Sequence, residues 1–234
     1  MPLVFYDTET TGSNAWYDQI LQFAAIRTDD GLNELERFEV RCRLLPHMVP
    51  SPGALAVTGM TIGQLTEPAL PSHYAMVRAI REKLLWWSPA VMAGYNNLEF
   101  DEMLVRRALY QTLHSPYLTN TNGNSRADIL QIAMALNQFE PGILNFAMRP
   151  DGKPSFRLDT LAPANGFAHA DAHDGLADVE ATIHVARIVR SKAREFRDHT
   201  IALGSRTAAV DYAMAVKTPR TMTPARSFLT YHVH

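Results

Sequence analysis

The sequence predicts an α/β fold in which a mixed β-sheet is flanked by helices, and three observations lead to this expectation. Short apolar runs typical of strands dominate the first 45 residues. Beyond residue 60, several segments show the helical spacing of apolar residues. A further strand-like run at 91–95 lies between those helical segments. Strands that come first and then mix with helices are typical of a helix-covered sheet.

Three strands are expected before residue 45. The first is the apolar run Leu3–Tyr6, and the second is Ile20–Arg27. In the third, Phe38, Val40, Cys42 and Leu44 alternate with charged or polar residues, which is the pattern of a half-buried strand. Residues 46–59 hold three prolines and two glycines, so we expect a loop there.

Capping residues mark the first helices. Thr61 with Gln64 forms a capping box that opens a short helix, and Ser72 caps the next one. The run Val91–Tyr95 is the fourth expected strand, and a helix over residues 98–113 follows it.

The second half of the chain is expected to be mostly helical. Ser125 and Asp128 form a possible capping box before an apolar helix that starts at Ile129. Residues 140–157 are rich in proline and glycine and are expected to be irregular. Short and long helices are predicted over Leu158–Ala164 and Gly175–Arg194, and a strand is possible over Phe228–Val233.

Composition favours one soluble domain with an appended tail. The 234 residues are 47% hydrophobic and carry a formal net charge of −2, which excludes a disordered or fibrous protein. Residues 191–234 hold seven Lys/Arg and three Asp/Glu. Judged by charge alone, this excess is best interpreted as an ordinary solvated surface. We expect a domain over residues 1–195 and a basic tail over 196–234.

Cellular location is predicted from what the sequence lacks. Cys42 is its single cysteine, so no internal disulfide can form. No signal peptide is visible, and no stretch reaches the roughly 18 apolar residues of a membrane span. A cytoplasmic protein without a membrane segment is expected.

The pair Asp7-x-Glu9 is the first candidate for chemistry. In a strand, residues two apart point to the same side, so both carboxylates leave one face at the end of an apolar run. Two like charges so placed repel unless they are protonated or bridged by a cation, for which Mg²⁺ suits oxygen ligands. By itself the pair is a weak indication, because most such acids are simply solvated.

Further candidates lie on later elements. Asp178 borders the buried face of the last helix, although, taken alone, it is better explained as an acid favoured by the dipole in the first turn of a helix. Asp101 lies early in its helix and, taken alone, is best interpreted as an exposed acid. His173 could remove a proton from water. A rival interpretation places zinc on His169 and His173, but glycines make 166–175 a poor helix.

Together these residues predict a metal-dependent hydrolase. Four acids and one histidine, which are Asp7, Glu9, Asp101, His173 and Asp178, stand where elements of an α/β fold converge. This set suits two metal ions about 3.5–4 Å apart on a phosphodiester.

The order and spacing of the five residues resemble the DEDD exonuclease superfamily in its histidine-bearing branch. Longer strings at residues 94–101, 124–128, 154–158, 164–166 and 172–183 are similar to the nuclease domain of the bacterial exonuclease I family. The likeness covers about residues 3–190. It implies a ribonuclease-H-like fold and 3′→5′ degradation of single-stranded DNA to 5′-mononucleotides with two Mg²⁺ ions, for which Mn²⁺ substitutes.

The resemblance also implies a role for each residue. Metal binding falls to Asp7, Glu9 and Asp178, with Asp101 in support, and His173 is the general base. Substrate contacts fall to Glu9, Phe156, Arg157 and the segment Thr10, Thr11 and Gly12. An arginine fork suits a phosphate and a phenyl ring can stack on a base, but a buried core Phe156 is an equal alternative.

One departure, one expected partner and two alternatives follow from the same residues. Members of the exonuclease I family continue with a barrel-like domain, whereas this chain ends near its expected start, so the tail 196–234 is interpreted as the start of a truncated barrel. The resemblance suggests single-stranded-DNA-binding protein as a partner. An exoribonuclease or small-RNA trimmer uses the same five residues. An inactive nucleic-acid-binding module usually lacks one of them.

Overall fold

A five-stranded mixed sheet forms the centre of the molecule in the computed structural model, which describes residues 1–168, 174–195, 198, 210–211 and 214. The strand order is β3-β2-β1-β4-β5. Strands β1, β2 and β3 pair antiparallel, while β4 and β5 run parallel to β1. Their bounds are β1 Leu3–Thr10, β2 Ile20–Thr28, β3 Glu34–Arg41, β4 Val91–Gly94 and β5 Ser125–Asp128. The predicted mixed sheet is confirmed.

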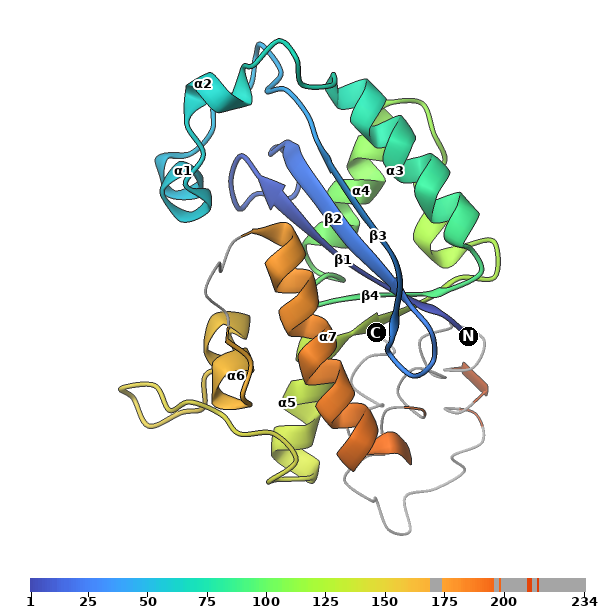
Figure 1. The fold of residues 1–234 in the computed structure, drawn as a ribbon, viewed down its shortest axis with the longest axis vertical. Coiled ribbons are helices and arrows are strands. Elements are labelled where there is room, and N and C mark those ends of the chain that lie inside the picture. The colour runs from blue at the N-terminus through green and yellow to red at the C-terminus, as the bar shows by residue number, and fades with distance from the viewer. Residues whose placement is uncertain (169–173, 196–197, 199–209, 212–213, 215–234) are drawn as a thin grey trace.

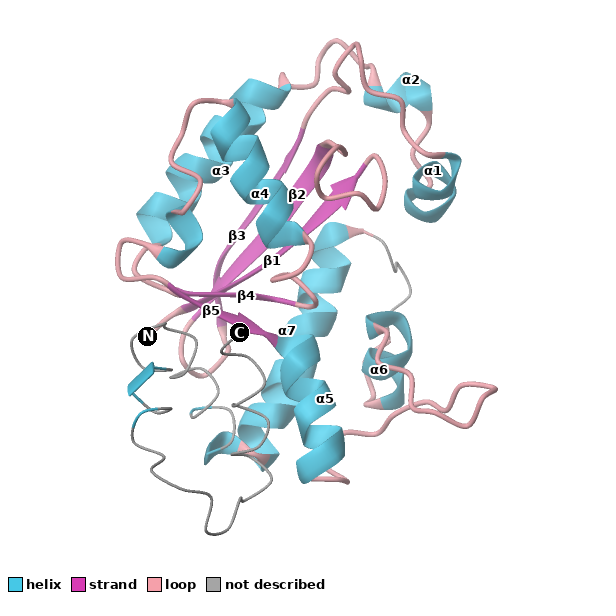
Figure 2. Cartoon of the chain, turned by 180° about the vertical axis from the view of Figure 1, so that it is seen from behind, coloured by secondary structure: helices cyan, strands magenta, loops and turns pink. Residues whose placement is uncertain are grey.

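Helices cover both faces of this sheet, as Figures 1 and 2 show. Helices α5, α6 and α7 pack with one buried cluster, and α3 and α4 pack with the other. The short helices α1 and α2 stand off the sheet beyond the end of β1 (Figure 1). The bounds are α1 Pro52–Thr58, α2 Ile62–Leu65, α3 His73–Trp87, α4 Asp101–Gln111, α5 Ile129–Phe139, α6 Leu158–Ala164 and α7 Gly175–Lys192, with a 3₁₀ turn at Leu118–Asn120.

The alternation of side chains along β1 divides the core and aims the strand end. Leu3 and Phe5 are buried in the cluster under α7, whereas Val4 and Tyr6 are buried in the cluster under α3 and α4. Since the side-chain period of a strand is two, Asp7 continues the face of Phe5. The apolar run thus directs the acids at its end toward α7.

The prediction of a loop over 46–59 was wrong, because helix α1 lies inside it. Ser51 is its N-cap and accepts a hydrogen bond from the Ala54 N–H at 3.1 Å, with Pro52 at the first helical position. Gly59 ends the helix with φ +67°, a conformation that glycine adopts without steric cost. Proline near the start and glycine after the end are favourable helix signals that the proline count concealed.

The interpretation of Ser125 as a helix cap was also wrong. Residues 125–128 form β5, parallel to β4, and Asp128 alone caps α5 by accepting from the Leu130 N–H at 2.9 Å. The third strand begins at Glu34 and ends at Arg41, so Cys42 and Leu44 lie beyond it. Strand β5 is only four residues long, too short for its sequence to show the alternation that would reveal a strand.

The remaining expected elements formed with small shifts at their ends. The capping box of Thr61 and the cap Ser72 are confirmed. The helix expected over 98–113 begins at Asp101. The possible strand Phe228–Val233 lies outside the described residues, and the domain boundary at 195 stays a prediction. In the described part of the chain, none of the helices has both the length and the apolar character required to traverse a bilayer.

Candidate active site

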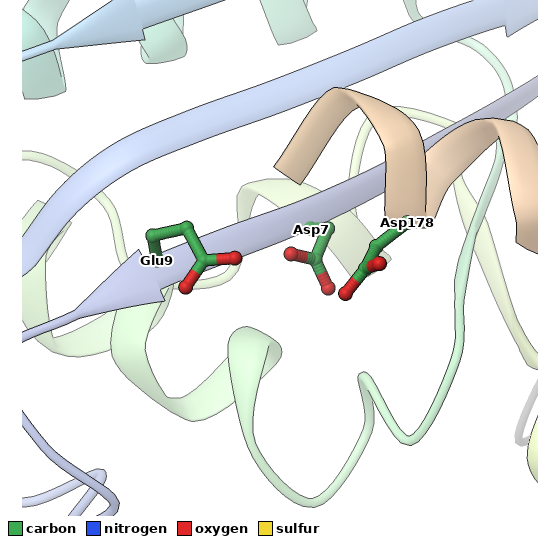
Figure 3. A group of neighbouring side chains, drawn as sticks. All are labelled: Asp7, Glu9 and Asp178. Atoms are coloured by element: carbon green, nitrogen blue, oxygen red, sulfur yellow. The ribbon is translucent and has the colours of Figure 1, made fainter. Parts of the chain in front are cut away.

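Three carboxylates from two distant segments meet at the end of β1. Ligand oxygens of Asp7, Glu9 and Asp178 all lie within 4.8 Å of one another (Figure 3). Asp7 and Glu9 leave the same face of β1, and Asp178 lies in the first turn of α7. A cluster of three oxygen donors within such a distance has the size and chemistry of a divalent-cation site.

Gly175 allows the start of α7 to approach β1 this closely. A Cβ atom at this position would lie 3.3 Å from the Cβ of Ala24 and 3.6 Å from Oδ2 of Asp7. The first distance is tighter than ordinary packing, so a larger residue would push the helix away from the sheet. The glycine after the Asp174 cap therefore brings Asp178 into the carboxylate cluster.

Asp101, the first residue of α4, lies against the edge of β1 that pairs with β4. The pairing of β1 with β4 ends at Phe5, and beyond it Asp101 Oδ1 accepts hydrogen bonds from the Thr8 backbone N–H at 3.0 Å and the Thr8 hydroxyl. Asp101 is buried, so its interpretation as an exposed first-turn acid was wrong. The side chain replaces the missing strand partner and stands beside the three-acid cluster.

The electrostatics show that these acids repel one another. Burial, followed by the charges of Asp178 and Asp101, raises the pKa of Glu9 from 4.5 to about 8. The pKa of Asp7 is raised well above its ordinary value by burial, then by Asp101, Asp178 and Glu9. Burial raises the pKa of Asp101 to about 7, although the hydrogen bonds from Thr8 oppose this.

This repulsion is a test of whether a cation fits. All of the donors are carboxylate oxygens, and they cannot all be ionised near neutral pH without a compensating positive charge. A hard divalent cation supplies that charge and prefers oxygen ligands. The residues present therefore fit a divalent metal centre.

The predicted general base His173 lies outside the described residues, and so does His169 of the rival zinc pair. The following residue, Asp174, is the N-cap of α7 and accepts from the Leu176 N–H at 3.2 Å. The role of His173 therefore stays a prediction.

A groove of about 640 Å³ leads away from the carboxylate cluster. Asp178 lines it together with Phe156 and Arg157. The exposed Arg157 guanidinium is paired with Asp159, with an Nη2–Oδ2 distance of 2.5 Å. Phe156 is half-buried, and its ring meets that of Phe146 edge-on at 5.2 Å between centroids. The structure thus brings both predicted substrate residues into one groove with Asp178.

The predicted substrate segment Thr10–Gly12 uses its side chains internally. The Thr10 hydroxyl donates to the Gly12 carbonyl at 2.6 Å, and the Thr11 hydroxyl donates to Asp18 at 2.8 Å. A Cβ on Gly12 would lie 2.6 Å from Asp18 Oδ2, so glycine is needed for this close turn. Contact between the segment and a substrate stays a prediction.

Sequence reasoning missed the residues that position the acids. Gln22 is buried on β2 opposite Glu9, and its amide donates to Asp174 at 3.2 Å and to Glu39 at 2.9 Å. It thereby links the sheet to the N-terminus of α7. A lone glutamine within the apolar run Ile20–Ile26 was the available signal, because a buried amide requires partners.

Comparison with known proteins places this chain in a family. The exonuclease family model RNase_T matches residues 4–186. Exodeoxyribonuclease I of Escherichia coli K12 is 36% identical over 198 residues, covering 84% of this chain and 41% of the relative. The crystal structure of E. coli exonuclease I with a dT13 oligonucleotide matches with a TM-score of 0.85 at 32% identity, covering 90% of this chain and 45% of that one.

A solved complex of ExoI with SSB-Ct also matches, with a TM-score of 0.78 at 34% identity over 85% of this chain and 43% of that one. The chain spans about two fifths of the length of the curated relative it matches. The sheet flanked by helices is the fold of the exonuclease I structure. The family model covers most of the chain, so this protein belongs to the RNase_T exonuclease family of the DEDD superfamily.

Proposed function

We propose that this chain is a divalent-metal-dependent 3′→5′ exonuclease that degrades single-stranded DNA to 5′-mononucleotides. The observation that carries the proposal is the convergence of Asp7, Glu9 and Asp178 within 4.8 Å. Membership of an exonuclease family and the dT13 oligonucleotide bound by the E. coli relative support the substrate class.

The metal centre in this proposal holds two Mg²⁺ ions, for which Mn²⁺ substitutes. Asp7, Glu9 and Asp178 would hold the ions, and Asp101 would support them from the Thr8 edge. When bound, the ions supply positive charge that stabilises the phosphodiester as it is cut. The raised pKa values of Asp7 and Glu9 support this, because burial and the neighbouring carboxylates raise them and a bound cation would compensate the negative charge.

The proton of the attacking water is assigned to His173. An imidazole titrates near neutral pH and can take up a proton when an adjacent group attacks. His173 directly precedes Asp174, which caps α7 one turn before Asp178. This chain position supports a place for the base beside the acids.

Substrate binding is assigned to the groove and to the end of β1. Arg157 would pair with a backbone phosphate in place of Asp159, and Phe156 would offer a ring edge or face to a base. The backbone of Thr10–Gly12 would contact the terminal nucleotide beside Glu9. The solved complex of ExoI with SSB-Ct supports single-stranded-DNA-binding protein as a partner of the longer relatives, and we extend this to the present chain as a proposal.

The test is release of mononucleotides from a single-stranded DNA oligomer with Mg²⁺ present. Replacing Asp7 by alanine should lower the rate by about 10³-fold, the effect of losing one strong electrostatic stabiliser at a reacting centre. The matched control is Glu82→Ala, which removes an exposed acid of α3 from a surface ion pair with Arg78. Equal rates for Asp7→Ala and the control would disprove the site.

A substrate panel separates the alternatives. Matched DNA and RNA strands, each with one end blocked in turn, measure polarity and sugar preference. Faster hydrolysis of RNA would favour the small-RNA trimmer, since recognition of the 2′-hydroxyl distinguishes the two strands. Binding without turnover of any strand would favour the inactive nucleic-acid-binding module.

A further inference from the structure

A second cavity lies just past the end of β1, away from the groove that contains Asp178. It has a volume of about 400 Å³ and is formed by the β1–β2 loop, the segment after β3, and the helices α3 and α4. We call it the loop cavity. Three of the residues that line it, Trp16, Tyr17 and Arg107, can contact a ligand there. None of these residues has a role in the proposed active site.

The loop cavity contains a cation with unused hydrogen-bonding capacity. The Arg107 guanidinium donates from Nη1 to the Ala15 carbonyl at 3.0 Å, while its Nε is buried without a hydrogen-bond partner. The nearby acid Asp18 is engaged within its own loop, where it accepts from the Thr11 hydroxyl and the Asn14 N–H. Arg107 lines the cavity, and a phosphate oxygen is a strong acceptor for the N–H groups of a guanidinium.

Two aromatic side chains stand exposed at the same cavity. Trp16 and Tyr17 are 68% and 78% exposed, although both ring systems are large and apolar. Exposed neighbouring aromatic residues beside a cation are typical of surfaces that stack bases of a single strand, since every base has a flat face. Aromatic rings and an arginine together therefore match one nucleotide, with its base and its phosphate.

Thr11 connects the loop cavity to the metal site. Its backbone N–H donates to the Gln19 carbonyl at 3.0 Å, and its hydroxyl accepts from the Gln19 N–H at 2.9 Å. Gln19 and Asp18 line the cavity, whereas Thr11 follows Glu9 by two residues. The cavity thus begins where the strand that carries the acids ends.

We infer that the loop cavity binds one nucleotide of a single-stranded nucleic acid, with the base on Trp16 and Tyr17 and a phosphate on Arg107. The identity of this ligand as a stretch of the substrate strand rests on the proposed function. The binding itself requires only the aromatic and cationic groups of the cavity. This subsite adds affinity for a strand without taking part in bond cleavage.

The test measures affinity for a fluorescein-labelled oligothymidylate by anisotropy in EDTA, where no hydrolysis takes place. In the double variant Trp16→Ala/Tyr17→Ala the Kd should rise about 10-fold or more, since a stacked base contributes that much to single-strand binding. The matched control is Trp86→Ala, because Trp86 is 76% exposed on α3 and does not line the cavity. The control should bind as the unsubstituted chain does.

Two further variants separate a ligand contact from a folding defect. Trp16→Phe keeps a stacking ring, so it should retain affinity while losing the strand-induced quenching of Trp16 emission. Arg107→Gln should reduce the slope of log Kd against log salt by about 0.7, the value for one phosphate contact to a single strand. Circular dichroism of each variant measures whether the fold is kept.

Equal affinity of the double variant and Trp86→Ala would overturn the inference. Loss of affinity for polyglutamate with unchanged affinity for oligothymidylate would also overturn it, because the surface would then belong to an acidic protein partner. These measurements need neither metal nor turnover, so they stand apart from Mg²⁺-dependent release of mononucleotides. A chain that binds in the cavity but cuts no strand would refute the proposed function alone.

Discussion

Adjacent residues Asp101 and Glu102 belong to two buried carboxylate clusters of opposite design. Glu102 accepts from the hydroxyls of Tyr6 at 3.0 Å and Thr119 at 2.6 Å. It is also paired with two guanidinium groups, those of Arg106 at 2.8 Å and Arg126 at 3.3 Å. Asp101 instead stands beside three further carboxylates, Asp7, Glu9 and Asp178. The pKa of Asp7 is raised by burial and then by each of the other three acids.

The difference separates an acid that the chain itself compensates from acids that it leaves without compensation. A buried charge that is needed only for stability is surrounded by opposite charges and hydrogen bonds of the chain itself. The acids at the end of β1 receive little such compensation, since Arg41 is the smallest of the influences on Glu9 and the others raise its pKa. Their compensation is left to a ligand from outside, which is what a metal centre requires.

The largest effect is expected from Glu102→Ala. The change leaves two largely buried guanidinium groups without their carboxylate, and breaking a buried ion pair in this way costs about 3 kcal/mol of unfolding free energy. Chemical denaturation measures it. Removal of the exposed Glu34 partner of Arg37 is the control and should change stability little. A small effect of Glu102→Ala would mean that the two clusters do not differ.

A change of opposite character is expected from Glu9→Gln. Hydrolysis should fall by about 10²-fold, because a charged group at the reacting centre is lost while the shape of the side chain is kept. The metal-free variant should be at least as stable as the unsubstituted chain above pH 8, since an ionised Glu9 is penalised there by burial and by Asp178. Activity assays and thermal denaturation in EDTA measure the two effects. Destabilisation on substitution would contradict the idea of repelling acids.

The pH dependence of stability sharpens the same contrast. The pKa of Glu9 is raised from 4.5 in the unfolded chain to about 8 in the folded protein. Between these two pH values, Glu9 is ionised in the unfolded chain but stays protonated in the folded protein. The free energy of unfolding of the metal-free protein should therefore decrease as the pH rises through this window and level off above it. Asp101, raised from 3.8 to about 7, contributes in the same direction. Thermal melts in EDTA across this range measure the decrease.

Divalent cations should remove this loss. Metal binding requires ionised carboxylates, so Mg²⁺ should stabilise the protein more at pH 8 than at pH 5. Melts with and without Mg²⁺ at each pH provide the measurement. A stabilisation that is independent of pH would indicate that the ion binds elsewhere.

The smallest effect is expected from Gln22→Leu. The amide links β2 to Asp174 at the start of α7, and removing such a supporting contact typically lowers metal affinity about 10-fold. Titration with Mn²⁺ and the Mg²⁺ dependence of hydrolysis measure the change. The control is Gln64→Leu, which removes an amide from the capping box of α2. An equal metal affinity in both variants would assign Gln22 a purely structural role.

Local sequence patterns were sufficient to predict most of the helices and strands. The ends of α6, the caps Ser72 and Thr61, and the first two strands depend on residues near one another in the chain, so the sequence could predict them. Helix α1 depends on the same local rules, yet three prolines made 46–59 resemble a loop. The prediction missed strand β5 for a different reason, because this strand exists only through its pairing with β4.

Some features of the candidate site could likewise be predicted from local sequence, whereas others depend on contacts between distant residues. The common face of Asp7 and Glu9 follows from the period of a strand, and the first-turn position of Asp178 follows from the helix predicted to begin at Gly175. The burial of Asp101 depends on Thr8, which is 93 residues away, and on the early end of the β1–β4 pairing. No local pattern contains that information.

The sequence by itself determined which residue types this protein can bring to a reaction and on which side of each strand or helix they stand, because both depend on local periodicity. Only the tertiary structure decided how closely Asp178 approaches Asp7 and Glu9, and that Glu102, next to Asp101, is paired with two guanidinium groups. The physical reason is that desolvation and Coulomb energy depend on distances across the fold, which long-range packing alone sets.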